Sequence, residues 1–137
     1  MADTVEFELV TPAKLVLSRP VEMVVVPGGE GDFGVLPGHA PMIATVRPGV
    51  VDIHMGGKVT ERIFIAGGFA EVSEERCTVL ADEAIPLQEL NAADARADLE
   101  AATKAAEKAA DDGARKLAET QIATAEAKIA AAEARGR

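Results

Sequence analysis

Aromatic side chains are nearly absent from this sequence. It contains four Phe and neither Trp nor Tyr, so it lacks the stacking surfaces that bind single-stranded nucleic acid. An excess of basic residues is absent as well, because the formal net charge is −9. Phosphate backbones and anionic lipid headgroups both attract basic surfaces. The composition therefore excludes nucleic acid as a partner and disfavours direct binding to a lipid surface.

Cysteine occurs once, at Cys77, which excludes an intrachain disulfide framework. The alternating pattern of residues 77–81 predicts that this thiol is a buried small hydrophobe rather than a nucleophile. The N-terminus has neither the basic start nor the apolar segment of a signal peptide. No window approaches the roughly 20 apolar residues of a membrane span. We expect a protein that is cytosolic or faces the cytosol.

Negative charge is concentrated in the first part of the chain, because residues 1–88 carry most of the acidic excess. This bias is typical of a domain that binds a basic protein partner, and equally of one that needs charge only for solubility. The apolar content of 48% is sufficient for a packed core. We therefore expect a folded protein rather than a disordered one.

Residues 4–86 have the pattern of short strands separated by turns. Residues 4–9 alternate polar and apolar side chains, which indicates a half-buried strand. Gly56-Gly57, between the apolar stretches 50–55 and 58–65, is typical of a two-residue hairpin turn. About eight to ten such strands at regular spacing predict an antiparallel β-sandwich or barrel.

The pattern changes at Pro86. Residues 92–135 contain no Pro and one Gly and are rich in Ala, a strong helix former. Asn91 is a favourable N-cap, and Asp94 stands where the acid of a capping box belongs. Asp111-Asp112-Gly113 interrupts the pattern once, so we expect two helices of about five turns each.

Each predicted helix carries an apolar seam with heptad spacing, which favours an antiparallel hairpin. The seam positions are Ala95, Leu99, Ala102, Ala106 and Ala109 in the first helix, and Ala118, Ile122, Ala125, Ile129 and Ala132 in the second. Small seam residues bury little apolar area. The sequence leaves open whether this hairpin is weakly held and mobile or a static spacer. We divide the chain into a β-sandwich domain, 1–87, and a C-terminal helical hairpin, 88–137.

Residues 27–41 contain five Gly and three Pro, a composition that predicts a shaped loop rather than a regular element. The polar side chains of this segment are Glu30, Asp32 and His39. Two carboxylates and one His are a weak basis for a metal site, so we assign no metal ligands. A small β-barrel hydrolase or isomerase that uses Asp32 and His39 remains an alternative, but no third orienting group is identifiable. We assign no catalytic residue.

Residues 30–41, Glu-Gly-Asp-Phe-Gly-Val-Leu-Pro-Gly-His-Ala-Pro, resemble the signature of the epsilon subunit of bacterial F-type ATP synthase. Further similarities follow in the same order at Arg47-Pro48-Gly49, at residues 66–72 and at residues 79–84, so the resemblance covers essentially the whole chain. It implies a β-sandwich of about ten antiparallel strands followed by an antiparallel α-helical hairpin, in agreement with the independent patterns. It also implies a non-catalytic subunit of the central rotor stalk of the proton-translocating ATP synthase, which helps to couple proton flow to ATP synthesis.

The resemblance also implies partners. Members of this family bind the gamma subunit and the polar loops of the c-ring. In many members the helical hairpin moves up beside gamma, toward the alpha and beta subunits, and restrains ATP hydrolysis. Glu30, Asp32 and His39 are then the candidate contacts with gamma and the c-ring, because an acidic loop suits a ring whose exposed loops are basic. The implied location is peripheral, at the cytoplasmic face of the bacterial plasma (inner) membrane. A free-standing β-sandwich adaptor that binds other proteins is the alternative.

Two features of the C-terminal part differ from the family pattern. Members that bind ATP have the motif Ile/Leu-Asp-x-x-Arg-Ala at the start of the first helix, whereas residues 90–97 space the acid and the Arg differently. The nucleotide contacts, if present, would be Glu83, Asp94 and Arg96, and no cofactor is assigned. The second helix is poorer in bulky and basic side chains than in strongly inhibitory members, so we predict weak self-inhibition.

Overall fold

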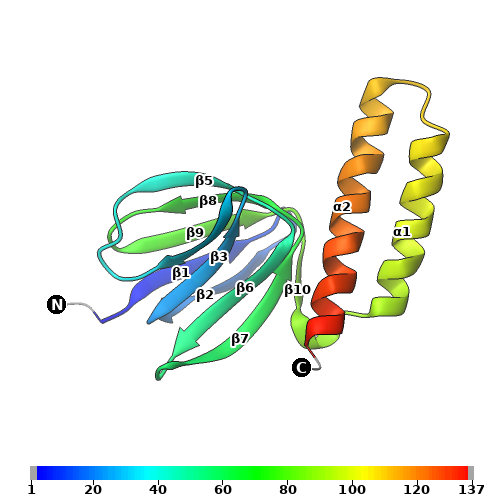
Figure 1. The fold of residues 1–137 in the computed structure, drawn as a ribbon. Helices are drawn as coiled ribbons and strands as arrows, with labels where there is room; N and C mark the ends of the chain where they lie inside the picture. Colours follow the sequence, from blue (N-terminus) through cyan, green and yellow to red (C-terminus); the bar gives the residue numbers. More distant parts are fainter. Residues whose placement is uncertain (1–2, 136–137) are drawn as a thin grey trace. The chain divides into compact units, whose positions relative to one another are not determined.

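The computed structural model describes residues 3–135. It contains ten strands, one short 3-10 helix and two α-helices (Figure 1). The chain divides into two compact units, Met1–Pro86 and Leu87–Arg137. The first unit contains all the strands and the second contains the helices.

Most strands alternate between more buried and more exposed side chains as their sequences predict, although β3 and β7 each end in three consecutive buried residues. Their bounds are β1 (Val5–Val10), β2 (Leu15–Val21), β3 (Met23–Gly28), β4 (Gly31–Val35), β5 (Met42–Val46), β6 (Gly49–Met55), β7 (Lys58–Ile65), β8 (Gly68–Val72), β9 (Arg76–Ala81) and β10 (Ala84–Pro86). In β1, Val5, Phe7 and Leu9 are fully buried. The predicted two-residue turn at Gly56-Gly57 is confirmed, because Met55 pairs with Lys58 across β6 and β7.

The strands form one continuous hydrogen-bonded sheet in the order β10-β7-β6-β3-β5-β8-β9-β1-β2, with β4 paired to β3. Only one residue pair, Gly28 with Val46, joins β3 to β5. The sheet bends at this join into two layers whose inner faces share one core (Figure 1). The predicted β-sandwich is therefore confirmed.

One strand pair departs from the antiparallel arrangement that we expected, because β1 and β9 run parallel. A parallel pair requires a long connection between its strands, and here strands β2 to β8 provide it. The alternation of side chains is the same in parallel and antiparallel strands, so the sequence pattern does not distinguish them.

Residues 27–41 are not a loop throughout, so the prediction of an irregular segment is wrong for its first half. β3 continues to Gly28, and β4 begins at Gly31 after a two-residue turn formed by Gly29 and Glu30. A Cβ atom on Gly28 would lie 2.6 Å from the carbonyl oxygen of Gly31. The glycines thus permit a close hairpin instead of interrupting the strands, and only residues 36–41 are irregular.

The second unit is a pair of antiparallel helices, α1 (Ala92–Glu107) and α2 (Asp112–Ala134), preceded by the 3-10 helix η1 (Leu87–Glu89). The predicted N-cap is confirmed, because the Asn91 side chain accepts a hydrogen bond from the Asp94 amide at 3.0 Å. Asp111 caps α2 in the same way, through the Ala114 amide. The helices have 16 and 23 residues rather than equal lengths, because α1 ends before the Asp-Asp-Gly break whereas α2 begins within it.

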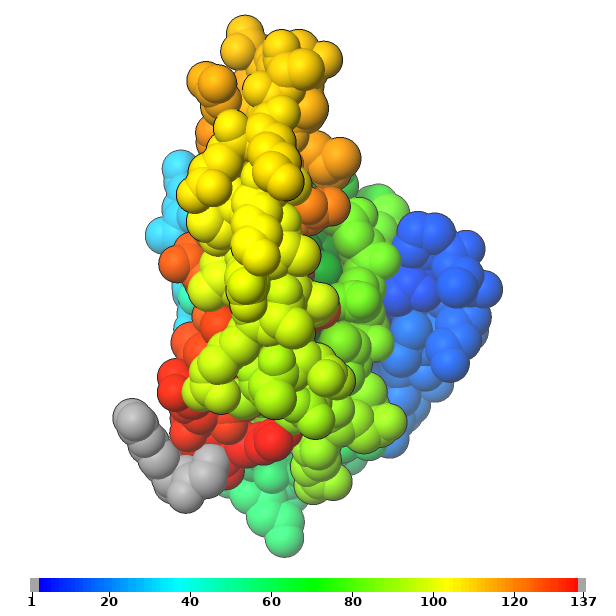
Figure 2. All heavy atoms as spheres, turned by 90° about the vertical axis from the view of Figure 1, so that its right-hand side faces the viewer, coloured from blue at the N-terminus to red at the C-terminus, as the bar shows by residue number. Residues whose placement is uncertain are grey.

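The alanines of the two predicted seams face each other inside this unit. Ala95 and Ala102 of α1 and Ala118, Ala125 and Ala132 of α2 are all buried. Figure 2 shows α1, in yellow-green, lying directly against α2, in orange to red. Small side chains allow two helix backbones to approach closely. The predicted helical hairpin is confirmed.

Candidate functional site

Two of the predicted contact residues lie at the tip of the β3–β4 hairpin. Glu30 is in the turn and is exposed, and Asp32 follows in β4, where it pairs with Pro27. The Asp32 carboxylate accepts a hydrogen bond from Nη2 of Arg47 at 2.5 Å, and Nη1 of the same guanidinium donates to the Gly28 carbonyl at 2.6 Å. We call residues 28–32 the acidic tip.

His39 lies in the irregular segment after β4 and is half-buried. Its Nδ1 donates a hydrogen bond to the Ala40 carbonyl at 2.7 Å, and its amide donates to the Leu36 carbonyl at 3.2 Å. The Gly38 amide binds the Glu74 carbonyl at 2.8 Å, which ties this segment to the turn between β8 and β9. The main chain therefore fixes the conformation of the segment.

The three predicted residues do not form a catalytic group. Within residues 3–135, no hydrogen bond joins His39 to Glu30 or to Asp32. The partner of the Asp32 carboxylate is a guanidinium and that of the His39 ring is a backbone carbonyl, so neither side chain activates the other. In the same described part of the chain, no three His, Cys, Asp or Glu side chains gather in a way that could hold a metal ion.

Sequence reasoning missed a patch of exposed apolar side chains on the outer face of the β5-β8-β9 layer. Ile43, Phe69 and Leu80 expose 77%, 56% and 52% of their surface. Phe69 lies opposite Leu80 across β8 and β9, and it lies opposite Thr45 on β5, which places Ile43 diagonally from it. We call Ile43, Phe69 and Leu80 the outer apolar patch. Contiguous exposed apolar surface of this kind marks binding sites for other proteins.

A weak signal for this patch is present in the sequence. Along β8 the side chains of Ala70 and Val72 are buried, which makes Phe69 and Glu71 the outward positions. A Phe on the same face as a Glu breaks the expected alternation. The sequence alone does not reveal that Leu80 is the neighbour of this Phe, because their pairing depends on the register of β8 and β9.

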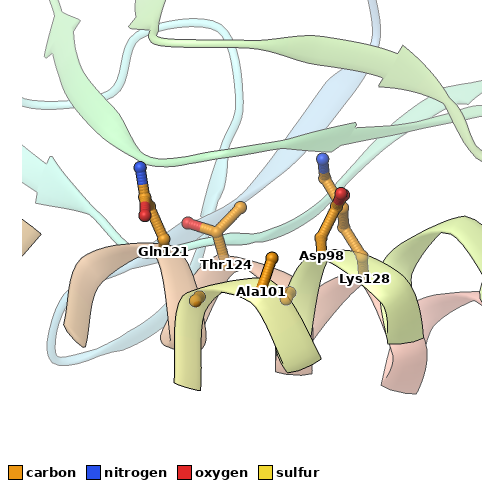
Figure 3. A pocket seen from close by; sticks show the side chains of 7 residues that line it. Asp98, Ala101, Gln121, Thr124 and Lys128 are labelled. Carbon is orange, nitrogen blue, oxygen red and sulfur yellow. The ribbon is translucent and has the colours of Figure 1, made fainter. Parts of the chain in front are cut away.

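The helical hairpin has a shallow groove of about 330 Å³ between its helices. Asp98 and Ala101 of α1 and Gln121, Thr124 and Lys128 of α2 line it, and Figure 3 shows their side chains projecting on the same side. Four of these five side chains are polar, but the groove is open to solvent and does not enclose a ligand as a binding pocket does.

The residues proposed for nucleotide contact do not line this groove. Arg96 forms an ion pair with Glu133 of α2 at 3.3 Å. Asp94 lies in the first turn of α1, where its amide is capped by Asn91. Glu83 belongs to the other unit, between β9 and β10. Nucleotide binding by Glu83, Asp94 and Arg96 stays a prediction.

Known proteins share this combination of a β-sandwich and two helices. The family model for the β-sandwich domain of the ATP synthase delta/epsilon chain matches residues 4–87. The chain belongs to this ATP synthase family. The ATP synthase epsilon chain of Rhodospirillum rubrum is 56% identical over 131 residues, and the alignment covers 96% of this chain and 98% of the relative. The epsilon chain of Paramagnetospirillum magneticum is 59% identical with the same coverage.

Solved structures extend the similarity to the whole fold. A chain in the cryo-EM structure of the Euglena gracilis mitochondrial ATP synthase, OSCP/F1/c-ring, superposes with a TM-score of 0.79 at 27% identity, over 96% of this chain and 82% of that one. A chain of the Tetrahymena thermophila mitochondrial ATP synthase, central stalk and c-ring, has a TM-score of 0.65 at 16% identity, over 93% and 96% of the two chains. The second likeness concerns the fold alone.

Membership of the epsilon chains confirms the predicted family and the predicted role of a non-catalytic stalk subunit. The enzyme alternative is wrong, because the chain belongs to a family of subunits without an active site of their own. The alternative of a free-standing adaptor is rejected for the same reason, because the chain belongs to a family of ATP synthase subunits. The role therefore depends on surfaces that contact other subunits, and the acidic tip and the outer apolar patch are the two candidates.

Proposed function

We propose that this chain works in the rotor of the ATP synthase as a link between the gamma subunit and the c-ring, with one surface for each partner. The outer apolar patch carries the proposal. A subunit that turns with its partners must stay attached through many catalytic cycles, which favours a dry apolar contact. The acidic tip serves a different purpose, because charged side chains contribute specificity and orientation more than affinity.

The outer apolar patch is assigned to gamma. Ile43, Phe69 and Leu80 are each exposed by half or more, and full burial of such a side chain stabilises a complex by roughly 1.5–3 kcal/mol. Since part of each side chain is already covered in the free chain, we expect roughly 1 kcal/mol from each, or about 3 kcal/mol together. Phe69 and Leu80 also line a groove of about 590 Å³ together with Val10 and Pro12, which gives an opposing side chain a place to insert.

The acidic tip is assigned to the c-ring. Glu30 is exposed at the turn, and the Asp32 side chain, 60% exposed, is beside it in β4. The ring presents polar loops to the stalk, and basic groups in such loops complement carboxylates. His39, in the segment that follows β4, is assigned to the same set of contacts with the ring or with gamma. The helical hairpin is assigned to the alpha and beta subunits.

The location follows from the assembly. The ATP synthase is a membrane-associated complex, and no helix in the described part of this chain is long and apolar enough to cross a membrane. We place the chain at the cytoplasmic face of the bacterial plasma membrane, held there by the c-ring and gamma rather than by lipid. Washing membranes under conditions that release the F1 sector should release this chain as well.

A double variant tests the assignment of the outer apolar patch. Replacement of Phe69 and Leu80 by Ser should weaken binding to purified gamma by at least about tenfold, because two apolar contacts are removed. Leu15→Ser is the matched control, because Leu15 is 56% exposed but lies on β2, outside the patch. Affinity can be measured by titration calorimetry. Undiminished gamma binding by a folded F69S/L80S variant would remove the patch from the interface.

A further inference from the structure

The motif Arg47-Pro48-Gly49 has no role in the contacts assigned so far, yet it packs against the base of the acidic tip. Arg47 follows β5 and is half-exposed. Its two guanidinium nitrogens bind the Gly28 carbonyl and the Asp32 carboxylate, which lie on the two strands of the same hairpin. A planar guanidinium can make both hydrogen bonds at once with little loss of freedom, which an ammonium cannot.

The main chain on both sides of the motif strengthens this attachment. The Arg47 amide donates to the Pro27 carbonyl at 2.9 Å, and the Gly29 amide donates to the Thr45 carbonyl at 2.9 Å. A Cβ atom on Gly49 would lie 2.9 Å from Cβ of Pro27, so the turn between β5 and β6 approaches β3 more closely than another residue would allow. The side-chain contacts of Arg47 thus extend an existing set of backbone contacts out to the tip.

The two carboxylates at the tip therefore differ in how available they are to a partner. Asp32 is neutralised in part by Arg47 at 2.5 Å. Among residues 3–135 no ion pair involves Glu30, although the side chain is exposed at the turn. The carboxylate that remains available to a basic partner group is therefore that of Glu30.

We propose that Arg47 is a positioning residue, which holds the β3–β4 hairpin so that Glu30 is presented to the c-ring while Asp32 serves as an internal anchor. The inference rests on the assignment of the acidic tip to the ring. Arg47 itself contributes through the hairpin and not by touching the partner. The geometry of the tip then depends on one guanidinium.

The first test needs only the isolated chain. In Arg47→Gln we expect the Gly29 amide to exchange with solvent at least about threefold faster by NMR, because the hairpin loses its side-chain attachment. Amides of β9 should keep their exchange rates. Arg47→Lys should restore part of the protection, since an ammonium can reach one of the two acceptors. Arg62→Gln is the matched control, because Arg62 forms an ion pair with Asp52 at 3.4 Å elsewhere in the sandwich. Unchanged exchange at Gly29 in Arg47→Gln overturns the inference.

The second test measures affinity for the purified c-ring in detergent. Arg47→Gln should weaken binding by roughly fivefold and Glu30→Gln by a similar factor, the scale of one exposed charged contact. The double variant should be no weaker than Glu30→Gln alone, because Arg47 acts through Glu30. Additive losses would mean that Arg47 contacts the ring itself, which contradicts a positioning role.

The two tests separate the inference from the proposed function. If Glu30→Gln leaves ring affinity unchanged, the acidic tip is not the ring contact and the proposed assignment fails, whatever Arg47 does. If Glu30→Gln weakens binding but Arg47→Gln does not, the assignment stands and the positioning role is wrong. Faster exchange at Gly29 together with a non-additive loss of affinity supports both.

Discussion

The chemistry of the Cys77 side chain is changed by its position in the fold. It lies in β9, fully buried in the sandwich core, and desolvation raises the pKa of its thiol from 9.0 to about 12. The expectation that it is a small core hydrophobe is confirmed by this burial. A thiol that stays protonated is a poor nucleophile, so we expect it to resist alkylation as long as the protein is folded.

The raised pKa predicts how stability depends on pH. Because the folded state holds the thiol proton more tightly than the unfolded state, the contribution of Cys77 is complete below pH 9 and is lost between pH 9 and about 12. The difference in unfolding free energy between the wild type and Cys77→Ala should therefore become smaller by about 1.4 kcal/mol per pH unit above 9. Urea unfolding at pH 8, 9 and 10 measures it, with the alanine variant correcting for the other titrating groups. A difference that does not change with pH would contradict the prediction.

The side chains of the candidate site were predicted with uneven success. Glu30 and Asp32 stood out in the sequence because they are charged residues within a glycine-rich stretch, and both are exposed. Ile43, Phe69 and Leu80 did not stand out, because an apolar residue in a strand is normally an inward one. Their exposure follows from strand register, which local sequence does not determine.

Among the elements, β8 depends on Gly68 for its position between two neighbours. Gly68 has φ of 141° and pairs with Val46 on β5 and Ala81 on β9. A Cβ atom there would lie 1.9 Å from the Leu80 carbonyl oxygen, so a larger residue cannot fit without moving β9. Gly31 has a similar φ of 144°, but nothing lies within 4 Å of its Cβ position.

Substitutions at Gly31 and Gly68 therefore allow the cost of backbone strain to be measured separately from the cost of a steric collision. Gly31→Ala should cost about 1–2 kcal/mol of unfolding free energy, from backbone strain alone. Gly68→Ala should cost at least about 2 kcal/mol more, because the carbonyl and the new methyl group collide. Denaturant unfolding of both variants under the same conditions gives the comparison. Equal losses would show that β9 can yield at this position.

The helical elements were largely predictable, because helix signals are local. Asn91 was identified as a cap from its identity and position, and its side chain accepts the predicted hydrogen bond. The β3–β4 hairpin was not identified, because five glycines in a short stretch normally indicate a loop. Gly28 has another role, because a Cβ atom there would lie 2.6 Å from the Gly31 carbonyl oxygen across the two-residue turn.

For the whole molecule, the hairpin of helices is the part that the ATP synthase should need least. The sandwich unit has its own hydrophobic core, whereas the two helices of the second unit are held to each other by alanine contacts. Deletion of residues 90–137 should leave the chain bound to gamma and change ATP hydrolysis by the assembled enzyme by less than about tenfold, since weak self-inhibition is expected. A steady-state ATPase assay of the purified complex measures it.

Co-elution of the shortened chain with the complex is the necessary control for that assay. An increase in hydrolysis of an order of magnitude or more would show that α1 and α2 act as a strong brake, against the prediction. Loss of the shortened chain from the complex would show that the helices contribute to attachment. The outer apolar patch would then account for less of the binding than we propose.

The sequence by itself determined the division into a strand-rich part and two alanine-rich helices, the caps, the alternation of β1 and the family. Each of these depends on neighbouring residues or on a short motif. Only the tertiary structure decided that β1 and β9 run parallel, that Phe69 and Leu80 meet on an outer face, and that Arg47 holds the acidic tip. The reason is physical: these features join residues far apart in the chain, and their contacts exist only once the sheet has chosen its register.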